Sequence, residues 1–159
     1  MDVPPAQDYP DVKIPPPLIF FAIMGIAGLL EYGVALNYPR GPVALRSAVA
    51  LIVFIFSGYL ALHAVVVLKK HGSFIDTRKP TARIVEDGPF RLSRNPMYLS
   101  LILVLFGLAL LFLSFWFLFA AVALWLVFNR IAVLPEEVYL ESKFGDRYTA
   151  YKMRVRRWV

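Results

Sequence analysis

Residues 97–128 form an apolar stretch, "MYLSLILVLFGLALLFLSFWFLFAAVALWLVF", that contains no charged side chain. As a single helix, these 32 residues would extend roughly 48 Å, well beyond the roughly 30 Å hydrocarbon core of a bilayer. As two helices folded back on each other, they would make two short spans of roughly 24 Å each. Length alone leaves both arrangements open.

The charges on either side of this stretch favour the fold-back. Basic residues collect at Lys69, Lys70, Arg78, Lys79, Arg83, Arg91 and Arg94 before it, and at Arg130, Lys143, Arg147, Lys152, Arg154, Arg156 and Arg157 after it. Because basic residues mark the cytoplasmic flanks of membrane spans, both ends belong on the same side. A hairpin satisfies this condition and a single crossing does not. We expect its turn near Leu111–Ser114, although no Pro or Gly–Asn pair marks it.

Two further apolar segments precede the hairpin. One runs from about residue 18 to 36 and is interrupted only by Glu31, and the other runs from about 48 to 68 and stops at Lys69-Lys70. Each is long enough to cross a bilayer. The sequence therefore predicts an all-α membrane protein with four transmembrane helices in a single domain, residues 1–159. The expected topology has both termini, the N-terminal tail 1–16 and the 69–96 loop in the cytoplasm.

Composition supports this fold class and limits the function. The chain is 59% hydrophobic and 18% charged, whereas soluble domains carry about 25% charged residues. The net charge is +6, and the basic residues that cause it lie beside the predicted spans. This position indicates contact with anionic lipid headgroups and argues against nucleic-acid binding. The absence of cysteine excludes disulfides and thiolate sites, and with His63 and His71 as the only histidines we expect no metal site. The predicted location is a bacterial or archaeal inner membrane.

The C-terminal segment, residues 135–159, has an amphipathic pattern. Apolar residues recur at three- and four-residue spacings, which predicts a helix, a break at Gly145 and a second helix; they are Val138, Leu140, Phe144, Tyr148, Tyr151 and Val155. Pro135 suits the first turn of a helix, where the carboxylates of Glu136 and Glu137 would complement the helix dipole. An equally good interpretation places these carboxylates opposite Arg94 and Arg91, in a polar pocket for a ligand with a carboxylate and an ammonium group.

Other candidates also have a structural and a functional interpretation. Asn95-Pro96 fits a helix cap followed by a first-turn proline. Tyr98, Tyr148, Tyr151 and Trp158 fit an aromatic belt at the membrane interface better than a binding site. Glu31 would reach water or pair with Arg40. His63 is favoured as a packing residue over a proton acceptor.

Two motifs resemble a known family. "GPFRLSRNPMYLS", followed by an apolar hairpin and "PEEVYLESKFGDRYTAYKMRVRRW", is similar to the integral-membrane methyltransferase superfamily. That group includes the isoprenylcysteine carboxyl methyltransferases and the phospholipid N-methyltransferases. The resemblance covers residues 88–158. It departs from the prenylcysteine enzymes at Asn95, where they usually have His, and near Ser100, where Gly is common.

The resemblance implies a pocket for S-adenosyl-L-methionine at the cytoplasmic ends of the last two helices, closed by residues 135–159. Carried over by position, the cofactor-binding residues would be Arg94, Asn95, Pro96, Tyr98, Leu99, Glu136, Glu137, Tyr148 and Tyr151, and the catalytic residues Arg94, Glu137 and Arg130. The implied activity is methyl transfer to a lipophilic acceptor from the bilayer. A prenylcysteine-like carboxylate, a phospholipid amine and another hydrophobic small molecule remain open as the acceptor. The alternative is a non-enzymatic membrane scaffold or lipid-binding protein with this fold. The oligomeric state stays open.

Overall fold

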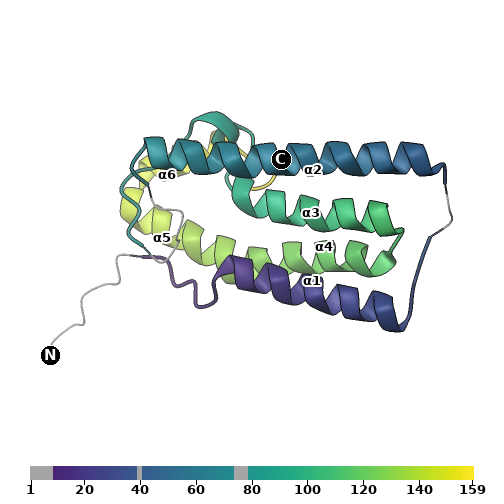
Figure 1. Cartoon of the computed structure of the whole chain (residues 1–159). Coiled ribbons are helices and arrows are strands. Elements are labelled where there is room, and N and C mark those ends of the chain that lie inside the picture. Colours follow the sequence, from purple (N-terminus) through teal and green to yellow (C-terminus); the bar gives the residue numbers. More distant parts are fainter. Residues whose placement is uncertain (1–8, 39–40, 74–78) are drawn as a thin grey trace, which may run out of the picture.

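The computed structural model describes residues 9–38, 41–73 and 79–159. Four long apolar segments lie side by side in an up-and-down arrangement, and short helices gather at one end (Figure 1). Three helices in the described ranges are long and apolar enough to span a membrane: α1 (Pro16–Gly33), α2 (Val43–Lys70) and the continuous rod Phe115–Phe144. The fourth apolar helix, α3 (Pro96–Phe112), has 17 residues.

The hairpin turn lies within the segment that the sequence predicted. Between α3 and α4 (Phe115–Phe128), Leu113 adopts a left-handed conformation with φ 56°. Backbone from the α1–α2 connection holds this turn, since the Tyr38 amide donates to the Leu113 carbonyl at 3.0 Å and the Phe115 amide to the Leu36 carbonyl at 2.9 Å. The turn is therefore fixed by contacts from elsewhere in the chain.

Glu31 lies at the same end of the bundle as the hairpin turn. Its carboxylate accepts hydrogen bonds from Asn37 Nδ2 at 3.0 Å and from the Ser114 hydroxyl at 2.5 Å. Glu31 thus ties α1 to the hairpin turn. The expected pairing with Arg40 lies outside the described residues.

Close packing joins α2 to α3. A Cβ added at Gly107 would lie 2.7 Å from the Phe54 ring, so only glycine fits there without movement. The Ser57 hydroxyl donates to the Ser100 carbonyl at 2.8 Å in the buried interface. Small residues and interhelical hydrogen bonds are the usual means by which helices associate in membranes. The outer faces carry exposed apolar side chains such as Leu51, Ile55 and Leu62, which suit a lipid environment.

Several predicted boundaries need correction. α2 begins at Val43, earlier than expected. In the described part of the N-terminal tail, Val12 packs into the core, whereas Tyr9 and Ile14 are exposed. The fourth helix does not end at Phe128, because a π-helical segment, η2 (Asn129–Val133), joins α4 directly to α5 (Leu134–Phe144). The Leu134 amide bonds to the Asn129 carbonyl five residues back.

Pro135 explains this wide turn. A proline inside a helix lacks the amide that would bond four residues back, and its ring clashes with the carbonyl there. A π-turn relieves that crowding and rotates the residues that follow. Pro135, Glu136 and Glu137 lie in the first turn of α5, as predicted. The helical rod runs into α5 from η2 without a break, so no free N-terminus is there for the two carboxylates to complement.

The amphipathic C-terminal segment folds as predicted into two helices. α5 ends at Phe144, Gly145 takes a positive φ of 53°, and α6 (Asp146–Arg154) follows. Val138 is an exception to the predicted pattern, because it is 66% exposed and points away from the packed face. The 69–96 connection contains the short 3-10 helix η1 (Gly88–Arg91), and its Ile84 packs against Tyr148 and Tyr151.

Candidate active site

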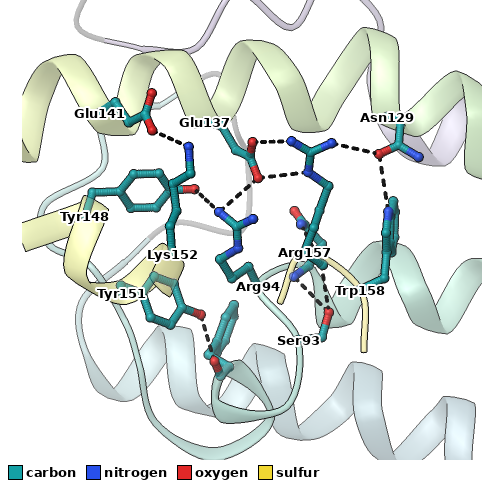
Figure 2. A network of polar contacts seen from close by, with 12 residues as sticks. Ser93, Arg94, Asn129, Glu137, Glu141, Tyr148, Tyr151, Lys152, Arg157 and Trp158 are labelled. Atoms are coloured by element: carbon teal, nitrogen blue, oxygen red, sulfur yellow. Dashed lines mark hydrogen bonds and ion pairs between the residues drawn. The ribbon is translucent and has the colours of Figure 1, made fainter. Parts of the chain in front are cut away.

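The candidate site is built around Glu137 on α5. The π-segment turns this side chain inward, where it is only 5% exposed. Its Oε1 lies 3.0 Å from Arg94 Nη1 and accepts from Arg157 Nε at 3.0 Å, while its Oε2 accepts from Arg157 Nη2 at 2.6 Å. Figure 2 shows the carboxylate between the two guanidinium groups. A buried carboxylate is tolerated there because it is fully paired.

Arg94 is nearly as buried as its partner, with 9% of its side chain exposed. It lies at the start of the motif before α3, and its Nη1 also donates to the Tyr148 hydroxyl at 3.5 Å. Its Nε is buried and has no hydrogen-bond partner among the described residues. Such an unsatisfied donor is costly, and a ligand acceptor would relieve the cost.

The C-terminal tail, residues 155–159, folds back over the start of α3. The Arg156 carbonyl accepts from the Arg94 amide at 3.1 Å, and the Arg157 carbonyl accepts from Asn95 Nδ2 at 3.0 Å and from the Ser93 hydroxyl at 3.2 Å. Asn95 therefore holds the tail with its side chain and does not cap α3, contrary to the capping interpretation. Pro96 occupies the first turn of α3 as expected.

A cavity of about 320 Å³ opens beside the Glu137 cluster. Polar side chains of its lining come from the start of α3, from α5 and α6, and from the 73–83 connection; they are Ser73, Lys79, Thr81, Arg83, Arg94, Asn95, Glu136, Glu137, Tyr148 and Tyr151. Apolar side chains come from α2, the end of the connection and α3, among them Ala61, Val65, Leu68, Val85, Met97 and Leu101. Its volume falls at the lower end of the range of about 300–1,000 Å³ typical of small-molecule sites.

The tyrosines belong to this cavity and not to a surface belt. Tyr98, Tyr148 and Tyr151 are all buried. Tyr98 donates to Glu136 Oε2 at 3.2 Å, and Tyr151 donates to the Phe90 carbonyl at 2.7 Å. Burial, followed by the charge of Glu137, raises the pKa of Tyr148, so its hydroxyl stays protonated where it accepts from Arg94 Nη1.

Some predicted residues lie elsewhere. Leu99 does not line the cavity, although its amide bonds to the Asn95 carbonyl. Arg130 is exposed on the π-segment and faces a second, separate cavity. His63 packs beside Tyr59 and would lie 3.1 Å from a Cβ at Gly88, in accord with its interpretation as a packing residue.

Sequence reasoning missed Arg157 and Asn129. Arg157 forms both hydrogen bonds to Glu137 described above, and Asn129 Oδ1 accepts from Arg157 Nη1 at 3.5 Å and from the Trp158 indole at 3.2 Å. Arg157 was visible in the motif "MRVRRW", but its side chain reaches the site only through the folded-back tail. The prediction from the sequence also did not include Ser73 and Arg83, which line the cavity from a loop without a recognisable motif.

Comparisons with known proteins agree with this architecture. Residues 45–147, well over half of the chain, match the family model described as phospholipid methyltransferase. An uncharacterized protein from Haemophilus influenzae is 44% identical over 63 residues, which are 40% of this chain and 100% of that relative. No solved structure gives a significant match.

Proposed function

Since the chain belongs to the phospholipid methyltransferase family, we propose that it transfers a methyl group from S-adenosyl-L-methionine to a lipophilic acceptor. The observation that carries this proposal is the cavity whose lining combines charged and polar side chains with apolar side chains of α2 and α3. Such a cavity suits a charged cofactor next to a hydrophobic acceptor. A non-enzymatic scaffold has no need of the buried Arg94–Glu137 pair.

The residues present fit this cofactor. Arg94 has the unsatisfied Nε donor and would bind the α-carboxylate, for which a guanidinium is suited. Glu136 would face the α-ammonium, because its bond from Tyr98 leaves lone pairs on the carboxylate for a further donor. Glu137 then holds Arg94 in place, and Tyr148 and Tyr151 shape the cavity wall. S-adenosylmethionine would supply a methyl group on a sulfonium, which is transferred by in-line displacement.

The protein's own contribution is alignment and exclusion of water. The apolar side chains of Ala61, Val65 and Leu68 would position the acceptor, which would enter from the bilayer beside α2. An acceptor carboxylate is already ionised at neutral pH and needs no base. An acceptor amine must first lose a proton, and the carboxylate of Glu136 would accept this proton.

The proposed topology has four spans. α3 is short, at roughly 25 Å. Its C-terminal end meets the hairpin turn, and its N-terminal end borders the candidate site. The start of α1 and the end of α2 both border the cavity, which supports placing all of these ends at one face. The basic residues of that face support a cytoplasmic orientation in a bacterial or archaeal inner membrane.

The direct test is methyl transfer. Purified protein in bilayer nanodiscs is incubated with methyl-labelled S-adenosylmethionine and a lipid extract, and labelled lipids are then separated. We expect label in a lipid fraction with the wild type and none with Glu136→Gln. Transfer that is equal in the wild type and in Glu136→Gln would overturn the role of Glu136. No label with any lipid fraction or added hydrophobic acid or amine would favour the scaffold.

A further inference from the structure

A second cavity, of about 500 Å³, lies on the outer side of the π-segment. It is formed by the end of α4, by η2 and by the folded-back tail, and its lining residues are Arg94, Trp125, Leu126, Asn129, Arg130, Arg157 and Trp158. The two tryptophan rings lie with their centroids 6.5 Å apart and their planes tilted by 51°. The methyl-transfer site does not use this cavity.

The charge of this cavity is unbalanced. Three guanidinium groups line it, and no carboxylate is among its lining residues in the described part of the chain. Glu137, which does not line this cavity, pairs with Arg94 and Arg157 and offsets one positive charge. Arg130 adds a third cation and is exposed. An excess of guanidinium groups around a concave site favours an oxyanion, and phosphate above all, because it accepts paired N–H bonds.

The two cavities have different linings apart from Arg94. Arg94 borders both of them, whereas Glu137 borders the first and Arg157 the second. Figure 2 shows Glu137 and Arg157 in direct contact, with Asn129 and Trp158 beyond Arg157. A ligand in the second cavity would therefore meet Arg130 and Arg157, and not Glu136 or Glu137, although Arg94 borders both cavities.

The position of the cavity indicates where the oxyanion comes from. Trp125 and Leu126 are exposed on α4, which continues below them as an apolar surface with Val122 and Phe119 exposed. Tryptophan next to basic residues is typical of the membrane–water interface. A phospholipid whose phosphate binds Arg130 would thus have room for its acyl chains along α4.

We propose that this cavity binds the phosphate of a membrane phospholipid headgroup, with Arg130 and Arg157 as the ligands and the acyl chains lying along α4 beside Trp125. The proposed lipid site is distinct from the first cavity, because Arg94 is the one lining residue that the two cavities share in the described part of the chain.

The test uses delipidated, detergent-purified full-length protein and measures binding of phosphatidylglycerol in mixed micelles. Two comparison ligands are measured in the same way. Diacylglycerol with the same acyl chains lacks the phosphate, and inorganic phosphate lacks the acyl chains. We expect saturable binding of phosphatidylglycerol, no binding of diacylglycerol and far weaker binding of inorganic phosphate. Arg130→Ala should weaken the lipid affinity about tenfold, the value of one charge-assisted hydrogen bond. Arg130→Lys should restore part of it, because the charge returns without the paired geometry.

Arg147→Ala is the matched control, since it removes an equal charge from the exposed surface of α6. Unchanged lipid affinity in Arg130→Ala, or an equal loss in Arg147→Ala, would overturn the proposal. Inorganic phosphate that binds as tightly as the lipid would show a site for soluble anions. Displacement of the lipid by S-adenosylhomocysteine would show that the cavity belongs to the cofactor site.

Discussion

At the residue scale, Glu137 contributes both to stability and to the site. It is nearly buried between Arg94 and Arg157, and its removal would leave two cations close together without a partner. Leaving a buried charge unpaired costs about 3–5 kcal/mol. Its role in binding is indirect, because it fixes the guanidinium of Arg94 that we propose to hold the cofactor.

Glu137→Gln should therefore lose cofactor binding and lower the melting temperature. Adding Arg157→Gln to this variant should recover part of the melting temperature, because one unpaired cation disappears, without recovering binding. Calorimetric titration with S-adenosylhomocysteine and thermal unfolding measure the two effects separately.

Glu141→Gln provides the control one helical turn away, where the carboxylate pairs with Lys152 and is 41% exposed. Its binding and melting temperature should stay close to wild type, since surface ion pairs contribute little. Wild-type binding in Glu137→Gln would show that Glu137 does not organise the site.

At the element scale, the π-segment sets the direction of the site carboxylates. Pro135 blocks a regular helical turn, and the wider turn at Asn129–Val133 brings Glu137 inward while Val138 stays exposed. Replacing the proline would allow an ordinary α-turn, which rotates every later residue of α5.

Pro135→Ala should thus weaken S-adenosylhomocysteine binding by about tenfold or more, because Glu137 would turn away from Arg94 and Arg157. The melting temperature should fall less than in Glu137→Gln, because alanine is the better helix former. Val138→Ala, an exposed change on the same helix, is the control and should bind as the wild type does. A Pro135→Ala variant with normal affinity would contradict the assigned role of the π-segment.

The contact between α2 and α3 depends on Gly107. A methyl group there would meet the Phe54 ring at 2.7 Å, whereas a methyl group at Gly28 on α1 meets nothing within 4 Å. Gly107→Ala should destabilise the bundle by about 1–3 kcal/mol through overpacking. Gly28→Ala should leave stability unchanged or raise it by up to about 1 kcal/mol. Thermal unfolding in one detergent compares the two, and equal melting temperatures would argue against close packing at Gly107.

The sequence predicted some of these elements and not others, for physical reasons. Apolar length and flanking charge were enough for the hairpin, and Gly145 was enough for the break between α5 and α6. The turn residue Leu113 carries no local signal, because its left-handed conformation is imposed by backbone from residues 36–38. Arg157 could not be assigned for the same reason, since a residue of the tail reaches Glu137 only by long-range folding.

At the scale of the whole molecule, the arrangement predicts a topology. The tail before α1, the end of α2 and helices α5 and α6 lie at one end of the bundle, and the hairpin turn lies at the other (Figure 1). Because the chain has no cysteine, single cysteines report on sidedness without background. Tyr9→Cys and Arg147→Cys should react with a membrane-impermeant maleimide only in inverted vesicles. Tyr32→Cys, at a position that is 94% exposed near the far end, should react only in right-side-out vesicles. Labelling of residues 9 and 32 from the same side would contradict four spans.

The central claim is that the cavity beside Arg94 and Glu137 binds S-adenosylmethionine. The most direct measurement is calorimetric titration of the detergent-purified wild-type protein with S-adenosylhomocysteine, in parallel with Glu136→Gln and Arg94→Ala. We expect the wild type to bind at micromolar concentrations, with one ligand per chain, and neither variant to give measurable heat. A folded wild-type protein that binds no S-adenosylhomocysteine in the presence of lipid would contradict the proposed cofactor site.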